Sequence, residues 1–299
     1  MMPPFVNYVT FNRLGLTERS LRSILNTPED FEMHIIDSNS KDDTWSYIQS
    51  LSDSRIKSKT RFPLNNGPIL PSNFNLTKRR PEQYFITIDS DVYMKTPNWI
   101  SKFMEVFNAF PEAGLLGVHK GPPYCEKGPE VIARYSNGIS YLELKHGKLG
   151  APLDFVPGCC QCLRPELIRE MGYWSEENGY GDAELSLRVN NHTSFRAGFV
   201  TGIQIDMTQK IHCSECRAKQ WCKLDRSSNT CFTIHQKGHK NIEAAQLFMP
   251  KYYATFKELE EGKRTAYCAS IFDPKSYETH FYNMEWAMEN FNYFIQNTN

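Results

Sequence analysis

The sequence lacks the features that mark several specialised classes of protein. Neither sign of charge is in excess, because Lys plus Arg and Asp plus Glu both number 34. There is no apolar run of about 18 residues, the length that a membrane-spanning helix needs. The first residues also lack a basic stretch followed by an apolar one. These absences exclude binding to DNA or an anionic membrane through overall charge, and we expect a protein without a membrane span.

A disulfide framework is missing as well. The nine cysteines are odd in number and several are separated by only two residues, which is typical of reduced thiols or metal ligands rather than of secreted domains. This pattern favours a cytoplasmic protein. The composition is otherwise that of a globular chain: 40% of the 299 residues are hydrophobic and 13% aromatic, which is enough for one large or two modest domains.

The first 120 residues alternate short apolar runs with helix-like segments, which is typical of a parallel sheet with crossover helices. Residues 5–11 and 32–37 predict two strands of this sheet. A helix is expected between them from about Thr17, whose hydroxyl can cap it. Residues 84–94 predict a later strand, at whose exit Asp89 and Asp91 lie one residue apart.

The pattern changes from about residue 130. Residues 131–144 form two alternating runs around Asn137 and Gly138, the strongest short signal for a β-hairpin. The other elements expected here are strands at 153–163 and 196–205, a short helix that ends at Gly172, a helix beginning near Asp182, and two helices at about 241–261 and 276–297.

The paired carboxylates at the end of a core strand predict a bound cation. Asp89 and Asp91 would repel each other and lose hydration when half buried, unless a cation lies between them. Mg²⁺ or Mn²⁺ takes oxygen ligands and is commonly completed by substrate phosphates. Asp37 leaves the second strand at the same carboxyl edge, where parallel sheets bind ligands. The pattern therefore indicates a nucleotide diphosphate site, with a solvated Asp-rich turn as the alternative.

Five segments in order resemble the family-2-like glycosyltransferases of GT-A fold, over roughly residues 5–212. The resemblance implies an α/β protein with a mainly parallel, Rossmann-like central sheet flanked by helices, with a donor half at about 1–120 and an acceptor half at about 121–206. Around this core of residues 1–206 we expect a small β-hairpin region, a Cys-rich loop at 207–240 and a C-terminal helical extension at 241–299. The matching segments are VTFNRLGLTERSLRSIL (9–25), HIIDSNSKDDTW (34–45), NNGPILPSNFNL (65–76), TIDSDVY (87–93) and GYGDAELSLR (179–188).

The resemblance also implies roles for single residues. Asp91 would be the main metal ligand, and Asp89 would bind the metal through water or accept a ribose hydroxyl. His212 would be a third protein ligand, although a structural role is the alternative for a lone histidine. Asp182 would be the general base of an inverting reaction. Glu184 stays open as a second candidate, because Gly181 replaces the Glu of the family's usual Glu-Asp pair. The donor-binding residues that the resemblance implies are Val9, Phe11, Asp37, Asn73, Asp89 and Ser90.

Three aromatic residues surround the acidic segment around Asp182. Tyr173, Trp174 and Tyr180 have faces that could stack on an acceptor sugar or on a base. Core packing explains them equally well.

A Cys-rich loop departs from the family pattern. Four thiols with the spacing C-x2-C-x5-C-x8-C are enough for a tetrahedral structural zinc site, with uncoordinated thiols as the alternative. The loop is also locally basic, as are residues 55–61 and 78–80, so it could hold a polyanionic acceptor through phosphate contacts. The predicted zinc ligands are Cys213, Cys216, Cys222 and Cys231.

These observations predict a metal-dependent inverting glycosyltransferase that uses Mn²⁺ or Mg²⁺ and a nucleotide-sugar donor, for which we expect UDP. The acceptor is open among a glycan, a protein and a nucleic acid, including a hydroxylated base in DNA. One alternative is a nucleic-acid-binding module on a catalytically silent GT-A-like scaffold. Another is a nucleotidyltransferase, which would normally have a Gly-rich phosphate loop after the first strand, where this sequence has only Gly15.

Overall fold

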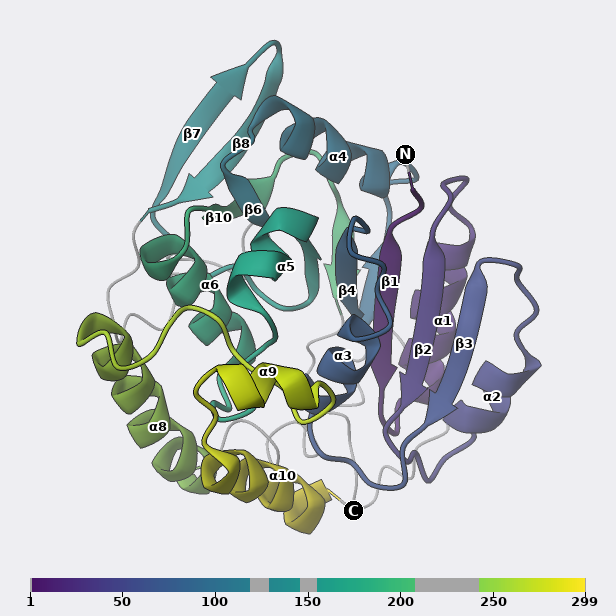
Figure 1. The fold of residues 1–299 in the computed structure, drawn as a ribbon. Coiled ribbons are helices and arrows are strands. Elements are labelled where there is room, and N and C mark those ends of the chain that lie inside the picture. The colour runs from purple at the N-terminus through teal and green to yellow at the C-terminus, as the bar shows by residue number, and fades with distance from the viewer. Residues whose placement is uncertain (1, 119–128, 146–154, 208–241, 299) are drawn as a thin grey trace.

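The structure is a computed structural model that describes residues 2–118, 129–145, 155–207 and 242–298. A nine-stranded sheet runs through its centre in the order β3-β2-β1-β4-β9-β6-β10-β8-β7 (Figure 1). In that order the strands are Ile56–Arg61, Glu32–Asp37, Phe5–Thr10, Phe85–Asp89, Cys160–Leu163, Ala113–Val118, Arg196–Val200, Ile139–Leu144 and Val131–Ser136.

The sheet is parallel in its first part and mixed beyond it. Strands β1 to β4 are mutually parallel, as the sequence predicts. Strand β9 then lies antiparallel between β4 and β6, and the β7–β8 hairpin extends the far edge. Between β9 and β8, strands β6 and β10 are again parallel to each other, so the central sheet is mainly parallel, as expected, with β9 and β8 running in the opposite direction. A second, two-stranded sheet pairs β5 (Val92–Met94) with β11 (Ile205–Met207).

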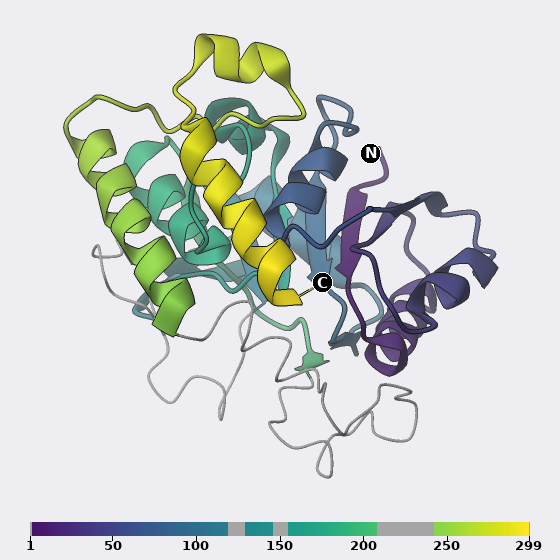
Figure 2. The same cartoon turned by 90° about the horizontal axis from the view of Figure 1, so that it is seen from below.

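Helices cover the central sheet on both faces. One apolar cluster joins the sheet to helices α1, α2 and α4, and another joins it to α3, α5 and α6. Helices α8 and α10 pack over α6 and α3, and Figure 2 shows them side by side. The helices are α1 (Leu14–Leu25), α2 (Thr44–Ser50), α3 (Ile69–Leu76), α4 (Trp99–Ala109), α5 (Pro165–Met171), α6 (Gly181–His192), α8 (Ile242–Glu260), α9 (Pro274–Thr279) and α10 (Met284–Thr298).

Several expected elements are confirmed, and others have different bounds. The hairpin turns at Asn137 (φ 49°) and Gly138 (φ 80°), the left-handed conformations that the Asn-Gly pair predicts. Helix α1 begins at Leu14, so Thr17 lies inside it, and its hydroxyl contacts that of Thr10 at 2.7 Å instead of capping the helix. The strand expected at 84–94 is interrupted between β4 and β5. In place of one helix at 276–297 there are two, α9 and α10.

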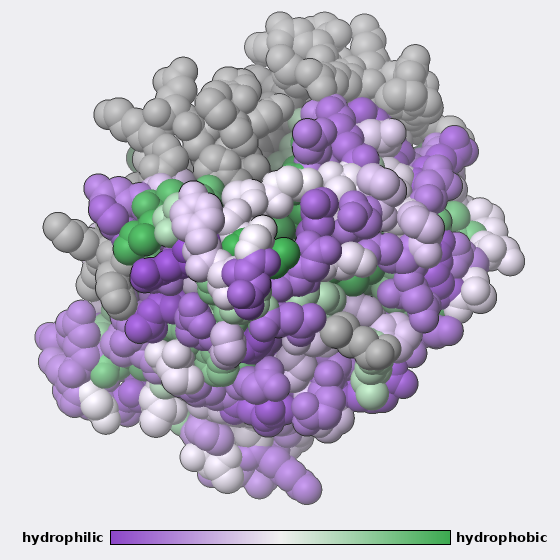
Figure 3. Space-filling model, turned by 90° about the horizontal axis from the view of Figure 1, so that it is seen from above, coloured by the Kyte–Doolittle hydropathy of each residue, from purple (hydrophilic) through white to green (hydrophobic). Residues whose placement is uncertain are grey.

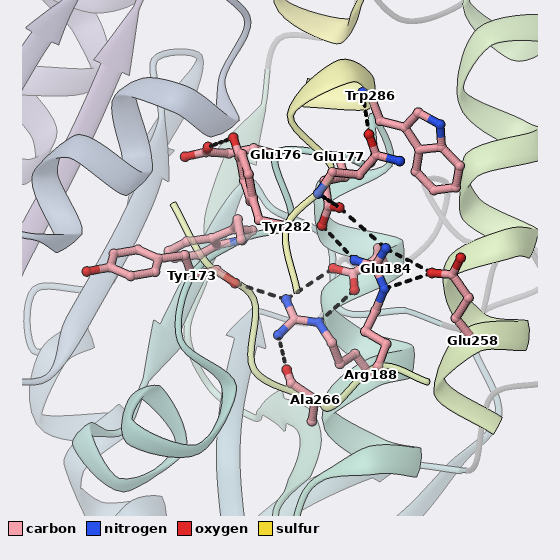
Figure 4. A network of polar contacts seen from close by, with 12 residues as sticks. Tyr173, Glu176, Glu177, Glu184, Arg188, Glu258, Ala266, Tyr282 and Trp286 are labelled. Carbon is pink, nitrogen blue, oxygen red and sulfur yellow. Dashed lines mark hydrogen bonds and ion pairs between the residues drawn. The ribbon is translucent and has the colours of Figure 1, made fainter. Parts of the chain in front are cut away.

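A buried ion pair on α6 is hydrogen-bonded to the segment between α8 and α9. Arg188 and Glu184, one helical turn apart on α6, are both fully buried, and the Arg188 Nε lies 2.6 Å from the Glu184 Oε1. Arg188 also donates to the carbonyl oxygen of Ala266, in the segment between α8 and α9. Figure 4 shows this pair with Glu258 of α8 nearby, and Glu258 contacts a second arginine, Arg264, at 2.9 Å. Charge that is enclosed in this way is stable only while every partner is present.

We predict that Glu184→Gln destabilises the protein by about 3 kcal/mol, because removing one partner of a buried pair leaves the other charge uncompensated. The matched control is Glu18→Gln. Glu18 pairs with Arg22 at the same helical spacing and at 2.6 Å, but on the surface, where a pair contributes about 0.5 kcal/mol or less. Urea unfolding of both variants measures the difference, and equal losses would contradict the prediction.

Candidate functional site

Strand pairing brings two of the candidate carboxylates to one edge of the sheet. Asp37, the last residue of β2, is in register with Thr10 of β1. Asp89, the last residue of β4, is in register with Val9 of β1. Both acids therefore lie at the carboxyl ends of their strands, on either side of β1. In Figure 1 this edge faces downward. The face at the opposite end, drawn in Figure 3, is largely hydrophilic with only small hydrophobic areas.

Asp37 is fully buried and holds one unused acceptor. The backbone N–H of Ser40 donates to its Oδ2 at 3.0 Å, and the same oxygen lies 3.4 Å from the Arg61 Nε. Its Oδ1 is buried and has no hydrogen-bond partner in the described part of the chain. Burial raises the pKa of Asp37. A buried acceptor without a partner is costly, and a ligand N–H or hydroxyl would satisfy it.

Asp91 lies in the turn between β4 and β5 and has similar surroundings. Its Oδ2 is 3.6 Å from the Arg13 Nη1, and its Oδ1 is buried without a hydrogen-bond partner among the described residues. A carboxylate oxygen of this kind fits a hard divalent cation. Within residues 2–118, 129–145, 155–207 and 242–298 no group of three or more His, Cys, Asp or Glu side chains could hold a metal ion. An ion at Asp91 would therefore rely on water and phosphate oxygens for many of its ligands.

The predicted third metal ligand and the predicted zinc ligands are not among the residues that the structure describes. These are His212 and Cys213, Cys216, Cys222 and Cys231.

Asp182 lies in the first turn of α6 and is partly exposed. The backbone N–H of Gly158 donates to its Oδ2 at 3.0 Å, and the N–H of Ala183 donates to its Oδ1 at 2.9 Å. Cys159 follows Gly158, and its carbonyl oxygen accepts the N–H of Asp89 at 2.9 Å. Residues 158 and 159 thus connect Asp182 to the end of β4.

Glu184 has different surroundings, although it lies only two residues further along α6. It is fully buried, and both of its carboxylate oxygens accept hydrogen bonds from Arg188. Of the two candidates for the general base, only Asp182 is accessible, so the geometry gives Glu184 a structural role.

The other donor-binding candidates divide into two groups. Val9 and Phe11, at the end of β1, are partly exposed beside Asp37 and Asp89. Asn73 is fully buried. Its Nδ2 donates to the carbonyl oxygen of Trp174 at 2.9 Å, and its Oδ1 accepts the N–H of Trp174 at 3.0 Å. Ser90 is also buried, and its carbonyl oxygen accepts the Tyr8 hydroxyl. Asn73 therefore braces the acceptor half.

The three aromatic candidates mostly pack within the protein. Trp174 is 5% exposed, and its ring lies 5.6 Å from that of Phe85. The Tyr173 hydroxyl donates to Asp273 at 3.0 Å. Tyr180 is partly exposed and contacts two aromatic rings of α8, those of Phe248 and Tyr252. Core packing is thus the role of Trp174, whereas Tyr173 and Tyr180 retain partly exposed surface.

The two described basic clusters are partly engaged within the protein. Lys59 donates to the carbonyl oxygens of Gln49 and Leu51, and Arg55 to those of Thr27 and Glu29. In the second cluster, Arg80 bonds to Glu32 at 2.7 Å and Arg79 donates to three carbonyl oxygens of residues 80–83. Lys57, Arg61, Lys78 and Arg80 keep exposed surface, so these contacts occupy only part of each cluster.

Sequence reasoning missed two arginines of the site. Arg13 contacts Asp91 and Arg61 contacts Asp37, so two of the three candidate carboxylates in the first 120 residues have a guanidinium beside them. The sequence contained a signal for both arginines. Arg13 follows the first strand and Arg61 ends the third, and these positions lie at the carboxyl edge where parallel sheets bind ligands.

No described helix is long and apolar enough to cross a membrane.

Solved structures with a similar fold include two of S. aureus TarS. One matches with 16% identity and a TM-score of 0.50, over 68% of this chain and 36% of that chain. The structure of TarS 1–349 matches with 17% identity and a TM-score of 0.50, over 68% and 59%. This chain therefore spans only about a third to three fifths of the TarS structures. A mannosyltransferase from Pyrobaculum calidifontis, in complex with GDP-Man and Mn²⁺, matches with 14% identity and a TM-score of 0.54, over 86% and 74%.

None of the curated proteins compared with the sequence matches it. A family model does: residues 7–172, more than half of the chain, match Glycosyl transferase family 2. The described elements and the solved structures agree with this match, since both show an α/β protein of GT-A type. The chain belongs to glycosyl transferase family 2.

Proposed function

We propose that the protein transfers a sugar from a nucleotide diphosphate donor to an acceptor hydroxyl, with inversion and with the help of a divalent metal ion. The observation that carries this proposal is the grouping of Asp37, Asp91 and Asp182 around the carboxyl ends of β2 and β4. Two of them have a buried oxygen without a partner in the described chain, and the third is partly exposed at the start of α6. One carboxylate is thus available for each of three tasks: binding the donor, holding the metal ion and accepting the proton of the acceptor hydroxyl.

Asp91 would hold the metal ion, with Asp89 binding through water. When bound, Mn²⁺ or Mg²⁺ supplies a Lewis acid that neutralises charge on the departing nucleoside diphosphate. The presence of Mn²⁺ in the mannosyltransferase structure supports this choice. Pairing of Met207 with Val92 brings β11 beside Asp91, a few residues before His212 in the sequence. This pairing supports His212 as a further ligand.

Asp182 would accept the proton of the acceptor hydroxyl. Two N–H groups donate to it, and the start of α6 is the positive end of the helix dipole, so its ionised form is favoured. Such a carboxylate is a weak base, and it suits a reaction in which proton transfer follows the breaking of the sugar–phosphate bond. One base on the acceptor side is what a single displacement with inversion requires.

Asp37 would bind the base of the donor. Its buried Oδ1 is suited to accept an N–H from the nucleotide base or a ribose hydroxyl, and Val9 and Phe11 offer partly exposed surface next to it. Uracil and guanine both carry a ring N–H, so UDP and GDP donors both fit this acceptor. We propose UDP first, and the GDP-Man complex of the mannosyltransferase makes GDP the second donor to test.

For the acceptor we propose a glycan hydroxyl. The described basic clusters are partly engaged within the protein, which removes part of the support for nucleic acid. The four cysteines of residues 213–231 remain predicted zinc ligands, and zinc analysis of the purified protein tests them.

A panel of nucleotide sugars tests the proposal as a whole. With Mn²⁺ present, UDP-GlcNAc or GDP-mannose should raise the melting temperature of the protein, because a ligand that binds only the folded state stabilises it. Metal-dependent hydrolysis of the same donors should follow. Failure of every nucleotide sugar to bind would support the alternative of a catalytically silent scaffold. Release of pyrophosphate from a nucleoside triphosphate would support the alternative of a nucleotidyltransferase.

We predict that Asp91→Asn abolishes Mn²⁺ binding and lowers the transfer rate by about two orders of magnitude or more, because it removes the charged metal ligand. The matched control is Asp206→Asn. Asp206 lies on the neighbouring β11 and pairs with Arg19 at 3.5 Å and with Lys95 at 3.9 Å. Calorimetric titration with Mn²⁺ and a transfer assay should separate the two variants; full metal binding by the Asp91 variant would refute the assignment.

We predict that Asp182→Asn lowers the rate by at least about a hundredfold, the usual contribution of a general base, while donor affinity is retained. Glu166→Gln is the control, because Glu166 is also an acid in the first turn of a helix. If Asp182 served only to complement the dipole of α6, both variants would cost a fraction of a kcal/mol in stability and leave the rate unchanged.

A further inference from the structure

A short polar segment directly before α6 is buried to an unusual degree. Ser175, Glu176, Glu177 and Asn178 are each 1% exposed or less, although none is apolar. We call these four residues the strap. Asp182 follows the strap after only three residues, and the Asn178 side chain accepts the N–H of Tyr180 at 2.9 Å between them. The place of Asp182 in space thus depends on what holds the strap.

Glu176 is held by four hydrogen-bond donors from three parts of the chain. Its Oε1 accepts the amide of Asn73 on α3 at 2.9 Å and the hydroxyl of Ser270 at 2.6 Å. Its Oε2 accepts the N–H of Ile271 at 3.1 Å and the hydroxyl of Tyr282 at 2.6 Å. No described lysine or arginine forms an ion pair with it. Burial raises the pKa of Glu176, and the four donors offset this cost.

Glu177 ties the strap to the same C-terminal region through charge. Its Oε2 lies 2.6 Å from the Nη1 of Arg264, and these side chains are only 2% and 3% exposed. Arg264 also contacts Glu258 of α8 at 2.9 Å. Asn290 of α10 donates to the carbonyl oxygen of Glu176 at 2.9 Å. Figure 4 shows the Tyr282 hydroxyl at the Glu176 carboxylate, with Glu177 close by.

The strap is also fixed to the donor half. Asn73 bonds to both the N–H and the carbonyl oxygen of Trp174, the residue before the strap, as well as to Glu176. Because α3 packs on β1, this side chain links the strap to the strand that lies between Asp37 and Asp89. Hydrogen-bond donors from residues 270–290 hold the strap on its other side.

We propose that Glu176 is a positioning residue for transfer, and that the C-terminal segment from Arg264 to Asn290 acts as its clamp and sets the place of Asp182. The inference rests on the proposed role of Asp182 as base. A segment without apolar side chains has no hydrophobic contact of its own to order it, so its conformation is set by the donors that surround it. Loosening them loosens the start of α6, and a small displacement of a base lowers the rate strongly.

The test uses the full chain and two variants. Glu176→Gln removes the charge that four donors bind, and Tyr282→Phe removes one donor in case the first variant does not fold. A hydrogen bond to a charged group shifts an equilibrium by roughly tenfold or more. We therefore expect amide exchange of residues 178–184 to accelerate about tenfold in the folded variants, with exchange in α1 unchanged.

Kinetics provide the second readout. With Mn²⁺, hydrolysis of UDP-GlcNAc or GDP-mannose, whichever the wild type cleaves, should fall about tenfold in kcat, while the affinity for UDP or GDP changes less than twofold. The matched control is Leu259→Ala, which loses packing between α8 and α6 but no bond to the strap. It should lower stability and leave kcat unchanged.

The outcomes separate this inference from the proposed function. If wild type cleaves no donor, the proposed function fails, and amide exchange alone decides whether Glu176 orders the start of α6. Unchanged exchange at 178–184 in both variants overturns the inference. So does an equal loss of kcat in Leu259→Ala, or an equal loss of nucleotide affinity and kcat in Glu176→Gln, because either result shows general destabilisation.

Discussion

The pairing of β1 with β2 on one side and β4 on the other is the constraint on which the site depends. It fixes Asp37 opposite Thr10 and Asp89 opposite Val9, so two acids from distant parts of the sequence reach one edge. A shift of either strand by one residue would turn every side chain to the other face. The apolar clusters on the two faces of the sheet oppose such a shift, and the core thereby also determines the geometry of the edge.

Buried carboxylates have different hydrogen-bond surroundings at the edge of the sheet and under the C-terminal helices. At the donor edge, Asp37 and Asp91 each keep an oxygen without a partner in the described chain, next to an arginine. Under the C-terminal helices, buried carboxylates are instead fully bonded, as Glu184 is by Arg188. Unsatisfied groups are costly and mark places where a ligand contributes the missing bond, whereas saturated networks make a region rigid.

Several strands of the central sheet could be predicted from sequence, because their signals are local. Strand alternation located β2 within residues 32–37, and the Asn-Gly pair located the hairpin. The antiparallel placement of β9 depends on contacts with β4 and β6 that no local pattern encodes. For the same reason the bracing role of Asn73 was not foreseen, because its partner Trp174 is about a hundred residues away. The burial of Glu184 was not foreseen either, because Arg188, its partner, is enclosed by the carbonyl oxygens of Met171 and Ala266.

The link through Gly158 and Cys159 has a consequence for how such a protein can diversify. The backbone N–H of Gly158 binds the Asp182 side chain, and the carbonyl oxygen of Cys159 binds the backbone N–H of Asp89, so main-chain atoms help to set the spacing between Asp182 and the end of β4. Substitutions of neighbouring side chains leave these atoms in place. In the proposed reaction, acceptor preference is then free to change through the surrounding surface, while the spacing of the two carboxylates is inherited unchanged.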